Sequence, residues 1–352
     1  MKKILSTLFF IIPLSIFAQL DNSPFYAADS LNGEKNDLYF NLNVLPFNKN
    51  NEYYSKFTNG QTYLGYQVTP SFEFYLTDNI SITGGVFANK DFGGDKFSQT
   101  DPFFQVKMKR KNDLFIFGNI NGNVNHKYIE PLYDFNSIFY RPQEMGMQYL
   151  VKRKHANFDL WLDWSKNIYQ GDPFLEEINV GFSGEIILSK KENSSFTIPA
   201  QFIFYHEGGQ IDSSDNKMEL YTNGSIGFKY TRKIKSKFLN EFSTENHLVY
   251  YKDHMVDDSL RYHGGGGIYL NATLKNKAHA ITLSYWYGNH FQSFRGDRIF
   301  FSQSTAYKGA GTLNANRNLL FIRFISNYQL SEDVQFSMRF ELYYDFNKTW
   351  KE

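Results

Sequence analysis

One loop near the end of the chain gathers the residue types that hydrolytic chemistry uses. It reads YWYGNHFQSFRGDR and places His290 three positions before Ser293, with Arg295, Asp297 and Arg298 close behind. A serine hydrolase needs a nucleophile that is hydrogen-bonded to a base, and a third group that orients the base. The spacing of His290 and Ser293 does not establish such an arrangement, and no Gly-x-Ser-x-Gly elbow is present. The sequence therefore predicts a protein that is not an enzyme.

We expect His290, Arg295, Asp297 and Arg298 to belong to a recognition or constriction loop that folds into the mouth of the protein. The alternative is an extracellular loop that holds a small aromatic cluster of its own. Residues 121–143, which are also rich in Tyr and Phe, leave the same two alternatives open.

The sequence predicts no metal and no cofactor. Its eight histidines are scattered, without a His-Glu-x-x-His motif, and it contains no cysteine, which excludes zinc–thiolate sites and thiol nucleophiles. Asp253, Asp257 and Asp258 share a loop and suit Ca²⁺, although solvated loop acids are the simpler interpretation. Residues 264–267 are four glycines, but no Lys-Ser/Thr follows, so they do not form a phosphate loop. With 37 basic against 36 acidic residues, the chain lacks the basic excess of a nucleic-acid binder.

The secondary structure that must position these residues is clearest in the sequence pattern of residues 334–346. Seven apolar side chains alternate there with six largely polar ones, a period of two that only a β-strand can segregate onto two faces. Globular strands usually have 5–6 residues, whereas about 9–11 are needed to cross a bilayer at a tilt. Residues 64–76 and 196–205 repeat the pattern, and we identify about fifteen such segments. Short turns alternate with long polar connections between them, which is typical of a transmembrane barrel.

The N-terminus predicts export. Met1-Lys2-Lys3 is followed by an apolar stretch and by Ala18, which together indicate a cleaved signal peptide over residues 1–18. We expect an N-terminal periplasmic extension over residues 19–36 and a barrel over residues 37–352. No other stretch approaches 18 consecutive apolar residues, so transmembrane helices are excluded.

This alternation of long strands, short turns and long loops resembles the outer-membrane β-barrels of Gram-negative bacteria, of the porin-like kind. The resemblance implies an all-β, antiparallel transmembrane barrel with short periplasmic turns and long extracellular loops, located in the outer membrane. Single-chain bacterial barrels have even strand numbers. We therefore expect about 16 strands, or else 14, with a further strand near residues 298–306 or a final strand absent.

The strand faces opposite the apolar stripes carry charges of both signs. An Arg or Lys that faced lipid near the bilayer midplane would cost roughly 2–4 kcal/mol, so these residues are expected to face the barrel interior. They either line an aqueous channel or pair across a plugged interior. The expected pore-lining residues are Glu73, Lys107, Asp159, Trp161, Asp163, Glu185, Lys229, Glu241, Glu245, Trp286, Arg323, Arg339 and Glu341.

The function that this pattern favours is a passive diffusion channel for small hydrophilic solutes, in contact with outer-membrane lipids. A second hypothesis is a non-conducting barrel for secretion, surface assembly or adhesion, with a protein partner at its extracellular loops. The third and least favoured is a lipid-modifying barrel enzyme.

Overall fold

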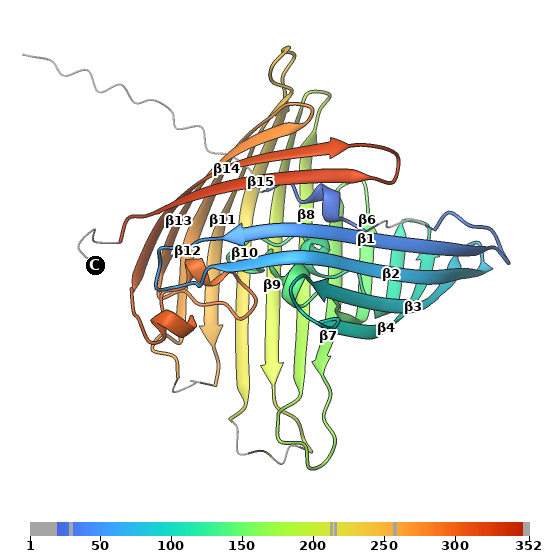
Figure 1. The fold of residues 1–352 in the computed structure, drawn as a ribbon. Coiled ribbons are helices and arrows are strands. Elements are labelled where there is room, and N and C mark those ends of the chain that lie inside the picture. Colours follow the sequence, from blue (N-terminus) through green and yellow to red (C-terminus); the bar gives the residue numbers. More distant parts are fainter. Residues whose placement is uncertain (1–19, 28–30, 212–213, 215–216, 256–258, 348–352) are drawn as a thin grey trace, which may run out of the picture.

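The computed structural model describes residues 20–27, 31–211, 214, 217–255 and 259–347. Within them, fifteen strands form one sheet, and each strand pairs antiparallel with the next one in the sequence (Figure 1). The strands are β1 (Leu38–Asn51), β2 (Gln61–Thr77), β3 (Ile80–Asp91), β4 (Gln99–Arg110), β5 (Asp113–Asn119), β6 (Met145–Lys152), β7 (Ala156–Lys166), β8 (Glu177–Lys190), β9 (Ser194–Glu207), β10 (Glu219–Lys233), β11 (Glu241–Asp253), β12 (Gly264–Lys275), β13 (His279–Asn289), β14 (Asn316–Gln329) and β15 (Gln335–Asp345).

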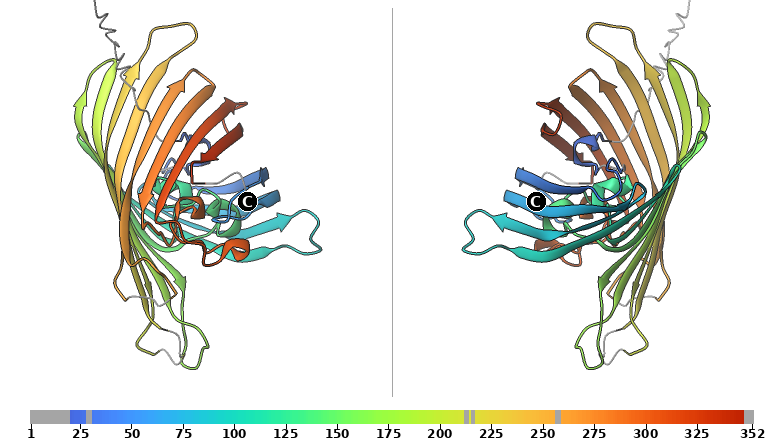
Figure 2. Two further views of the ribbon diagram at one scale, coloured as in Figure 1. Left: turned by 90° about the vertical axis from the view of Figure 1, so that its left-hand side faces the viewer. Right: turned by 90° about the vertical axis from the view of Figure 1, so that its right-hand side faces the viewer.

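The alternation of the sequence becomes two faces of a curved sheet. On β15, Phe336, Phe340 and Leu342 are exposed on the convex face, whereas Arg339 and Tyr343 lie on the concave face. Figure 2 shows the sheet curling around an interior, which we call the lumen. The prediction of an all-β antiparallel architecture is confirmed. None of the helices among the described residues is long and apolar enough to cross a membrane.

The strand count of the described chain is fifteen instead of the expected sixteen. The segment at residues 298–306, where a further strand was expected, holds the short helix η3 (Arg298–Phe300) and one bridge between Gln303 and Leu313. Its apolar residues Ile299, Phe300 and Phe301 are buried in the core, so they pack into the interior instead of facing lipid.

The connections at one end of the sheet have two to seven residues and those at the other end have seven to twenty-six, so they are sorted by length largely as the sequence predicted. We call these the turn end and the loop end. Two long connections fold back from the loop end into the lumen. The first lumen loop, residues 120–144, carries η2 (Asn123–His126) and α1 (Ser137–Tyr140), and the second lumen loop, residues 290–315, carries η3 and η4 (Tyr307–Gly309).

The two lumen loops pack against each other and against the wall. The Asp134 amide donates to the Arg295 carbonyl at 2.7 Å, and the Asp297 amide donates to the Glu130 carbonyl at 3.0 Å. Their apolar residues join inward-facing aromatic side chains of the strands in one buried core. The core therefore lies inside the barrel wall.

The segment that precedes β1 also lies against the lumen face. Leu20 is buried beside Ala280 and Ile325, and Asp21 forms an ion pair with Lys275 at 2.5 Å. The predicted signal peptide at residues 1–18 lies outside the described residues, so it stays a prediction, as do the domain boundaries at residues 19–36 and 37–352.

Candidate functional site

Three residues on two neighbouring strands form a hydrogen-bonded chain on the lumen face. The Ser225 hydroxyl of β10 lies 3.1 Å from Nδ1 of His247 on β11. Nε2 of the same imidazole lies 3.1 Å from Oε1 of Glu245. The three residues are 9%, 1% and 2% exposed, respectively. With Nδ1 accepting and Nε2–H donating, this is the order of nucleophile, base and orienting carboxylate that a serine hydrolase uses.

The pairing of β10 with β11 builds this site. Gly227 is the register partner of His247, so Ser225 lies two residues away, on the same face. A Cβ at Gly227 would lie 3.0 Å from both Cγ and Nδ1 of His247, tighter than ordinary contact. The glycine therefore leaves space for the imidazole to lie over β10 and reach Ser225.

A cation holds the carboxylate of the triad. Lys229, two residues beyond Gly227 on β10, places its ammonium 3.0 Å from Oε2 of Glu245. Glu245 thus meets the imidazole with one oxygen and the ammonium with the other. The Lys229 side chain is 37% exposed, so the triad is buried but lies beside a solvated part of the lumen.

The first lumen loop covers the triad on its other side. The Gln201 side chain on β9 accepts a hydrogen bond from the Ile129 amide at 3.0 Å and donates to the Lys127 carbonyl at 2.9 Å. Ser225 makes a second, longer contact of 3.4 Å with the same Gln201 oxygen. Gln201 therefore contacts both Ser225 and the backbone of the first lumen loop.

A second buried histidine anchors that loop and is not suited to act as a base. His126 donates from Nδ1 to Asp159 at 2.7 Å and from Nε2 to Glu144 at 2.9 Å, and its ring stacks on Trp161 with 4.3 Å between centroids. Burial alone would lower the pKa of His126, but the charges of Asp159 and Glu144 outweigh it and raise the pKa to about 9. Burial would raise the pKa of Glu144, yet the charge of His126 holds it at about 2. A cationic imidazolium with both nitrogens engaged cannot act as a base.

Two arginines hold the lumen loops against the wall: Arg295 belongs to the second lumen loop, and Arg323 on β14 binds the first. Arg295 reaches the wall, where it donates to Asp163 at 2.7 Å and to Asn179 at 3.0 Å. Arg323 on β14 pairs with Glu130 of the first lumen loop at 2.8 Å and with Glu341 of β15 at 3.0 Å. Both loops are therefore held by charge pairs with the barrel wall.

The predicted pore-lining residues all lie on the lumen face, in three groups. The first group holds the loops: Asp159, Trp161, Asp163, Trp286, Arg323 and Glu341. The second lies near the turn end and is partly exposed: Glu73, Lys107, Glu185 and Glu241. The third comprises Lys229 and Glu245 at the triad, and Arg339 at the edge of the sheet.

The residues of the predicted mouth loop do not form one cluster. The His290 ring stacks on Tyr262 with 4.4 Å between centroids, and Arg298 is exposed. The Ser293 hydroxyl accepts from the Gly296 amide, and among the described residues no hydrogen bond joins it to His290. Asp297 caps η3, and burial, followed by the nearby charge of Asp134, raises its pKa to about 7.

No group of three or more potential ligands for a metal ion occurs among the described residues. Asp253 pairs with His263 at 2.9 Å, whereas Asp257 and Asp258 lie outside the described part of the chain.

Sequence reasoning missed Ser225 and His247, and assigned Glu245 only to a pore lining. The signal was present but ambiguous, because Ser225 and His247 sit at inward positions of neighbouring strands. Finding the pair required the register across the turn between β10 and β11, which alternation alone does not give.

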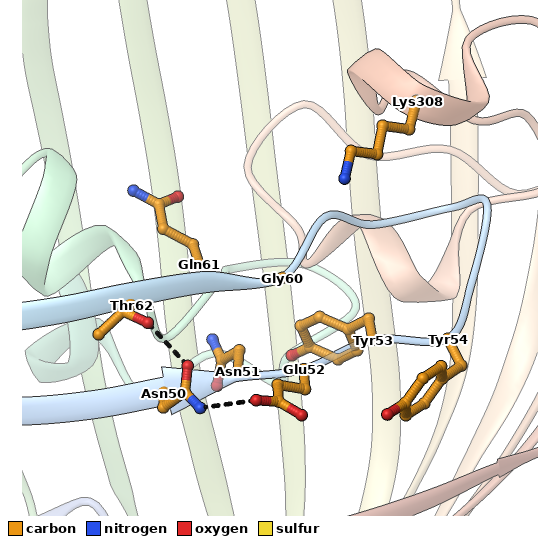
Figure 3. A pocket seen from close by; sticks show the side chains of 9 residues that line it. All are labelled: Asn50, Asn51, Glu52, Tyr53, Tyr54, Gly60, Gln61, Thr62 and Lys308. Carbon is orange, nitrogen blue, oxygen red and sulfur yellow. Dashed lines mark hydrogen bonds between the residues drawn. The ribbon is translucent and has the colours of Figure 1, made fainter.

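A pocket of about 380 Å³ at the loop end lies away from the triad. It is lined mainly by the β1–β2 hairpin, with Lys308 of η4 on the opposite side (Figure 3). Its hairpin side is polar and ordered, because Thr62 donates to Asn50 at 2.7 Å and Asn50 donates to Glu52 at 3.2 Å.

Comparison with known proteins decides the family. Residues 28–351 match the family described as lipid A 3'-O-deacylase-type. The chain belongs to this family. Membership in this family of deacylase type overturns the prediction that the protein is not an enzyme. The prediction was wrong because its search for a serine and a base was confined to residues close in sequence, whereas the hydrogen-bonded Ser225, His247 and Glu245 lie on two strands.

Solved structures also resemble this member of the lipid A 3'-O-deacylase-type family. OprD of Pseudomonas aeruginosa shares 8% identity over 88% of this chain and 87% of its own, with a TM-score of 0.46. OmpT of Vibrio cholerae shares 7% identity over 89% and 90%, with a TM-score of 0.49. OccAB3 of Acinetobacter baumannii shares 10% identity over 88% and 94%, with a TM-score of 0.45. No curated protein matches the chain. As a member of this family, the chain is an outer-membrane β-barrel protein, as the sequence predicted.

Proposed function

We propose that this protein is a membrane-embedded esterase that removes an acyl chain from a lipid A-type glycolipid. Ser225 is the nucleophile, His247 the base and Glu245 the carboxylate that orients the base. The observation that carries the proposal is the continuous chain of two 3.1 Å contacts from Ser225 through His247 to Glu245. Membership in the deacylase-type family supports an acyl ester as the substrate.

The proposed reaction proceeds by acyl transfer. Ser225 Oγ attacks the ester carbonyl while Nδ1 of His247 takes the hydroxyl proton, and Glu245 stabilises the imidazolium that forms. The bond between the acyl carbon and the sugar oxygen then breaks, and His247 gives its proton to the sugar oxygen. A water molecule, deprotonated by His247, then attacks the acyl-Ser225 ester; the bond from the acyl carbon to Ser225 Oγ breaks, His247 returns the proton to Oγ, and the fatty acid is released.

The test is deacylation of purified lipid A by the refolded protein, followed by mass spectrometry of the remaining acyl chains. Ser225→Ala should lower the rate about a thousandfold or more, because the triad acts as a unit. Ser243→Ala is the matched control, since Ser243 is a buried serine on the lumen face of β11 outside the triad. Wild-type rates in Ser225→Ala would refute the assignment. A fluorophosphonate probe should also label the wild type at Ser225.

A diffusion channel for small hydrophilic solutes is the second candidate function. It is favoured by the partly exposed charges near the turn end, including Glu73, Lys107 and Glu185, which indicate a solvated vestibule. The two packed lumen loops would have to leave room for solutes at the other end. Planar-bilayer conductance tests this candidate function. Conductance steps of equal size in the wild type and in Ser225→Ala would show that conduction is independent of hydrolysis.

A further inference from the structure

The sheet has two free edges, at β1 and at β15. The strand order runs from β1 to β15, and no pairing joins these two strands among the described residues (Figure 2). Because each neighbouring pair is antiparallel, β1 and β15 run in the same direction. Closing the wall would need a parallel pair, which is slightly less stable per residue. Unpaired backbone groups of an edge are costly in hydrocarbon, so they need polar partners.

Apolar side chains lie on both sides of this seam. On the convex face, Leu42 of β1 and Phe340 of β15 are exposed, as is typical of lipid contact. On the concave face, where other strands are mostly polar, β1 carries Leu45 and Phe47. An apolar surface therefore continues around the edge of β1 from the outside to the inside.

An aromatic cluster closes the seam from within, and both edges contact it. We call Phe25, Phe47, Phe135 and Phe139 the seam cluster; centroids are 5.0 Å apart for Phe47 and Phe139, and 5.4 Å apart for Phe25 and Phe135. Lys49 of β1 lies 4.9 Å from the Phe135 centroid, and Arg339 of β15 lies 4.3 Å from the same centroid. The first lumen loop, through Phe135, therefore bridges the two edges.

Arg339 has donors to spare at this position. Nη2 donates to the Asp21 carbonyl at 3.1 Å, whereas Nε and Nη1 are buried without a hydrogen-bond partner among the described residues. Leaving such donors unmet is unfavourable, and more so for a charged group. An oxygen-rich ligand at the seam would satisfy them.

The loop end of the seam is polar. Tyr53, which lines the pocket of Figure 3, contacts Tyr343 of β15 with 5.6 Å between ring centroids. Polar groups thus gather at one end of the seam and apolar groups lie along it, which is the distribution that a membrane lipid presents.

We propose that the β1–β15 seam admits one acyl chain of a membrane lipid from the bilayer to the seam cluster, with oxygens of the ester linkage accepting from Arg339. If the seam is the path of the substrate to Ser225, this inference rests on the proposed function. An ester in the membrane must pass the barrel wall to reach a triad that lies inside it. The lipid tail, and not a second protein, is the occupant, since both edges border the exposed apolar convex face that is expected to face lipid.

The test closes the seam covalently in a chain that has no cysteine of its own. Tyr53→Cys/Tyr343→Cys spans the loop end of the seam and Lys49→Cys/Arg339→Cys spans its middle, each joined by a short reducible bifunctional thiol reagent. The control pair, Leu160→Cys/Phe182→Cys, joins β7 and β8 at a register pair that is already hydrogen-bonded into the wall. Heat-modifiable migration verifies that each variant is folded.

Two readouts follow, in vesicles that contain a phosphatidylcholine with a photoreactive diazirine in its acyl chain. Before linkage, tandem mass spectrometry should find label on the seam cluster, and linkage of either seam pair should reduce that label at least tenfold. Linkage should not change the label on the convex face. Linkage of the control pair should change neither the label on the seam cluster nor the label on the convex face. Undiminished label on the seam cluster after linkage, or label only on the convex face from the start, would overturn the proposal.

Hydrolysis separates this inference from the proposed function. Linked Tyr53→Cys/Tyr343→Cys should lose at least tenfold in activity on lipid A in vesicles but keep its activity on p-nitrophenyl butyrate, a soluble ester. Full activity of the linked form on lipid A would exclude the seam as the route. If the wild type hydrolyses neither ester, the proposed function fails, and the labelling still decides whether the seam admits an acyl chain.

Discussion

The anchor of the first lumen loop can be tested by replacing His126 with glutamine. Glutamine is neutral, so Asp159 and Glu144 would remain buried without the charge that lies 2.7 and 2.9 Å from them. Removing one partner of a buried ion pair typically costs roughly 3–5 kcal/mol. The rise in the pKa of His126 from 6.5 to about 9 corresponds to about 3 kcal/mol of loop binding. The free energy expected from the lost ion pair and the free energy that corresponds to the pKa shift are therefore of similar magnitude.

The same residue makes the loop sensitive to pH in a defined direction. Because the pKa of His126 is raised when the loop is bound, its stabilisation is complete below pH 6.5 and is lost as the pH rises through 9. Between these values the opening free energy should fall by up to about 1.4 kcal/mol per pH unit. At pH values above 9 the loop should therefore open far more often than at pH 6.

Hydrogen exchange of the amides of residues 123–129, corrected for intrinsic rates, measures this opening. The wild type should lose protection from pH 6.5 to 9, whereas His126→Gln should be weakly protected throughout. His155→Gln is the matched control, because His155 is an exposed histidine in the turn between β6 and β7. Constant protection of the wild type across this pH range, or equal protection in wild type and His126→Gln, would refute the role of the imidazolium.

Three further predictions concern the second lumen loop, the core and the lipid face. Arg295→Gln should release the second lumen loop, since charged hydrogen bonds such as that to Asp163 contribute about 1.5–3 kcal/mol; exchange of residues 292–303 would report it. Gly181→Val should displace Trp161, whose Cε2 lies 2.2 Å from the position of the new Cβ, and lower the free energy of unfolding by roughly 1–3 kcal/mol with a red-shifted fluorescence. Leu283→Arg, on the convex face, should lower the free energy of unfolding in phospholipid vesicles by about 2–4 kcal/mol near the midplane, and an unchanged value would contradict the assignment of that face to lipid.

The wall of the barrel was predictable because its signal is local. The alternation of residues 334–346 became β15, with Phe340 outside and Arg339 inside, and the short and long connections fall at opposite ends of the sheet. The even strand number was a statistical expectation about bacterial barrels. It misdirected attention to residues 298–306, whose apolar side chains pack inward as part of a loop.

The interior was less predictable because its contacts are distant in the sequence. His126 and Asp159 are 33 residues apart, and nothing in the aromatic composition of residues 121–143 says that this loop enters the lumen. Alternation places Ser225 and His247 inside but does not give their register. Chemistry that is built across strands is therefore visible only once the pairing of β10 and β11 is known.

The packing of the loops also constrains how any substrate reaches the triad. The first lumen loop lies over Ser225 through Gln201, and it is tied to the wall by His126 and to β14 by Arg323. Opening a path from the loop end would break buried charge pairs, each of which costs several kcal/mol to disrupt. The solvated vestibule beside Lys229 offers a path to soluble esters without that cost, but the acyl chain of a lipid would have to leave the hydrocarbon to use it. Within the described residues, the seam is bordered by apolar side chains that keep an acyl chain in apolar surroundings, so a membrane lipid and a soluble ester should respond differently when the seam is closed.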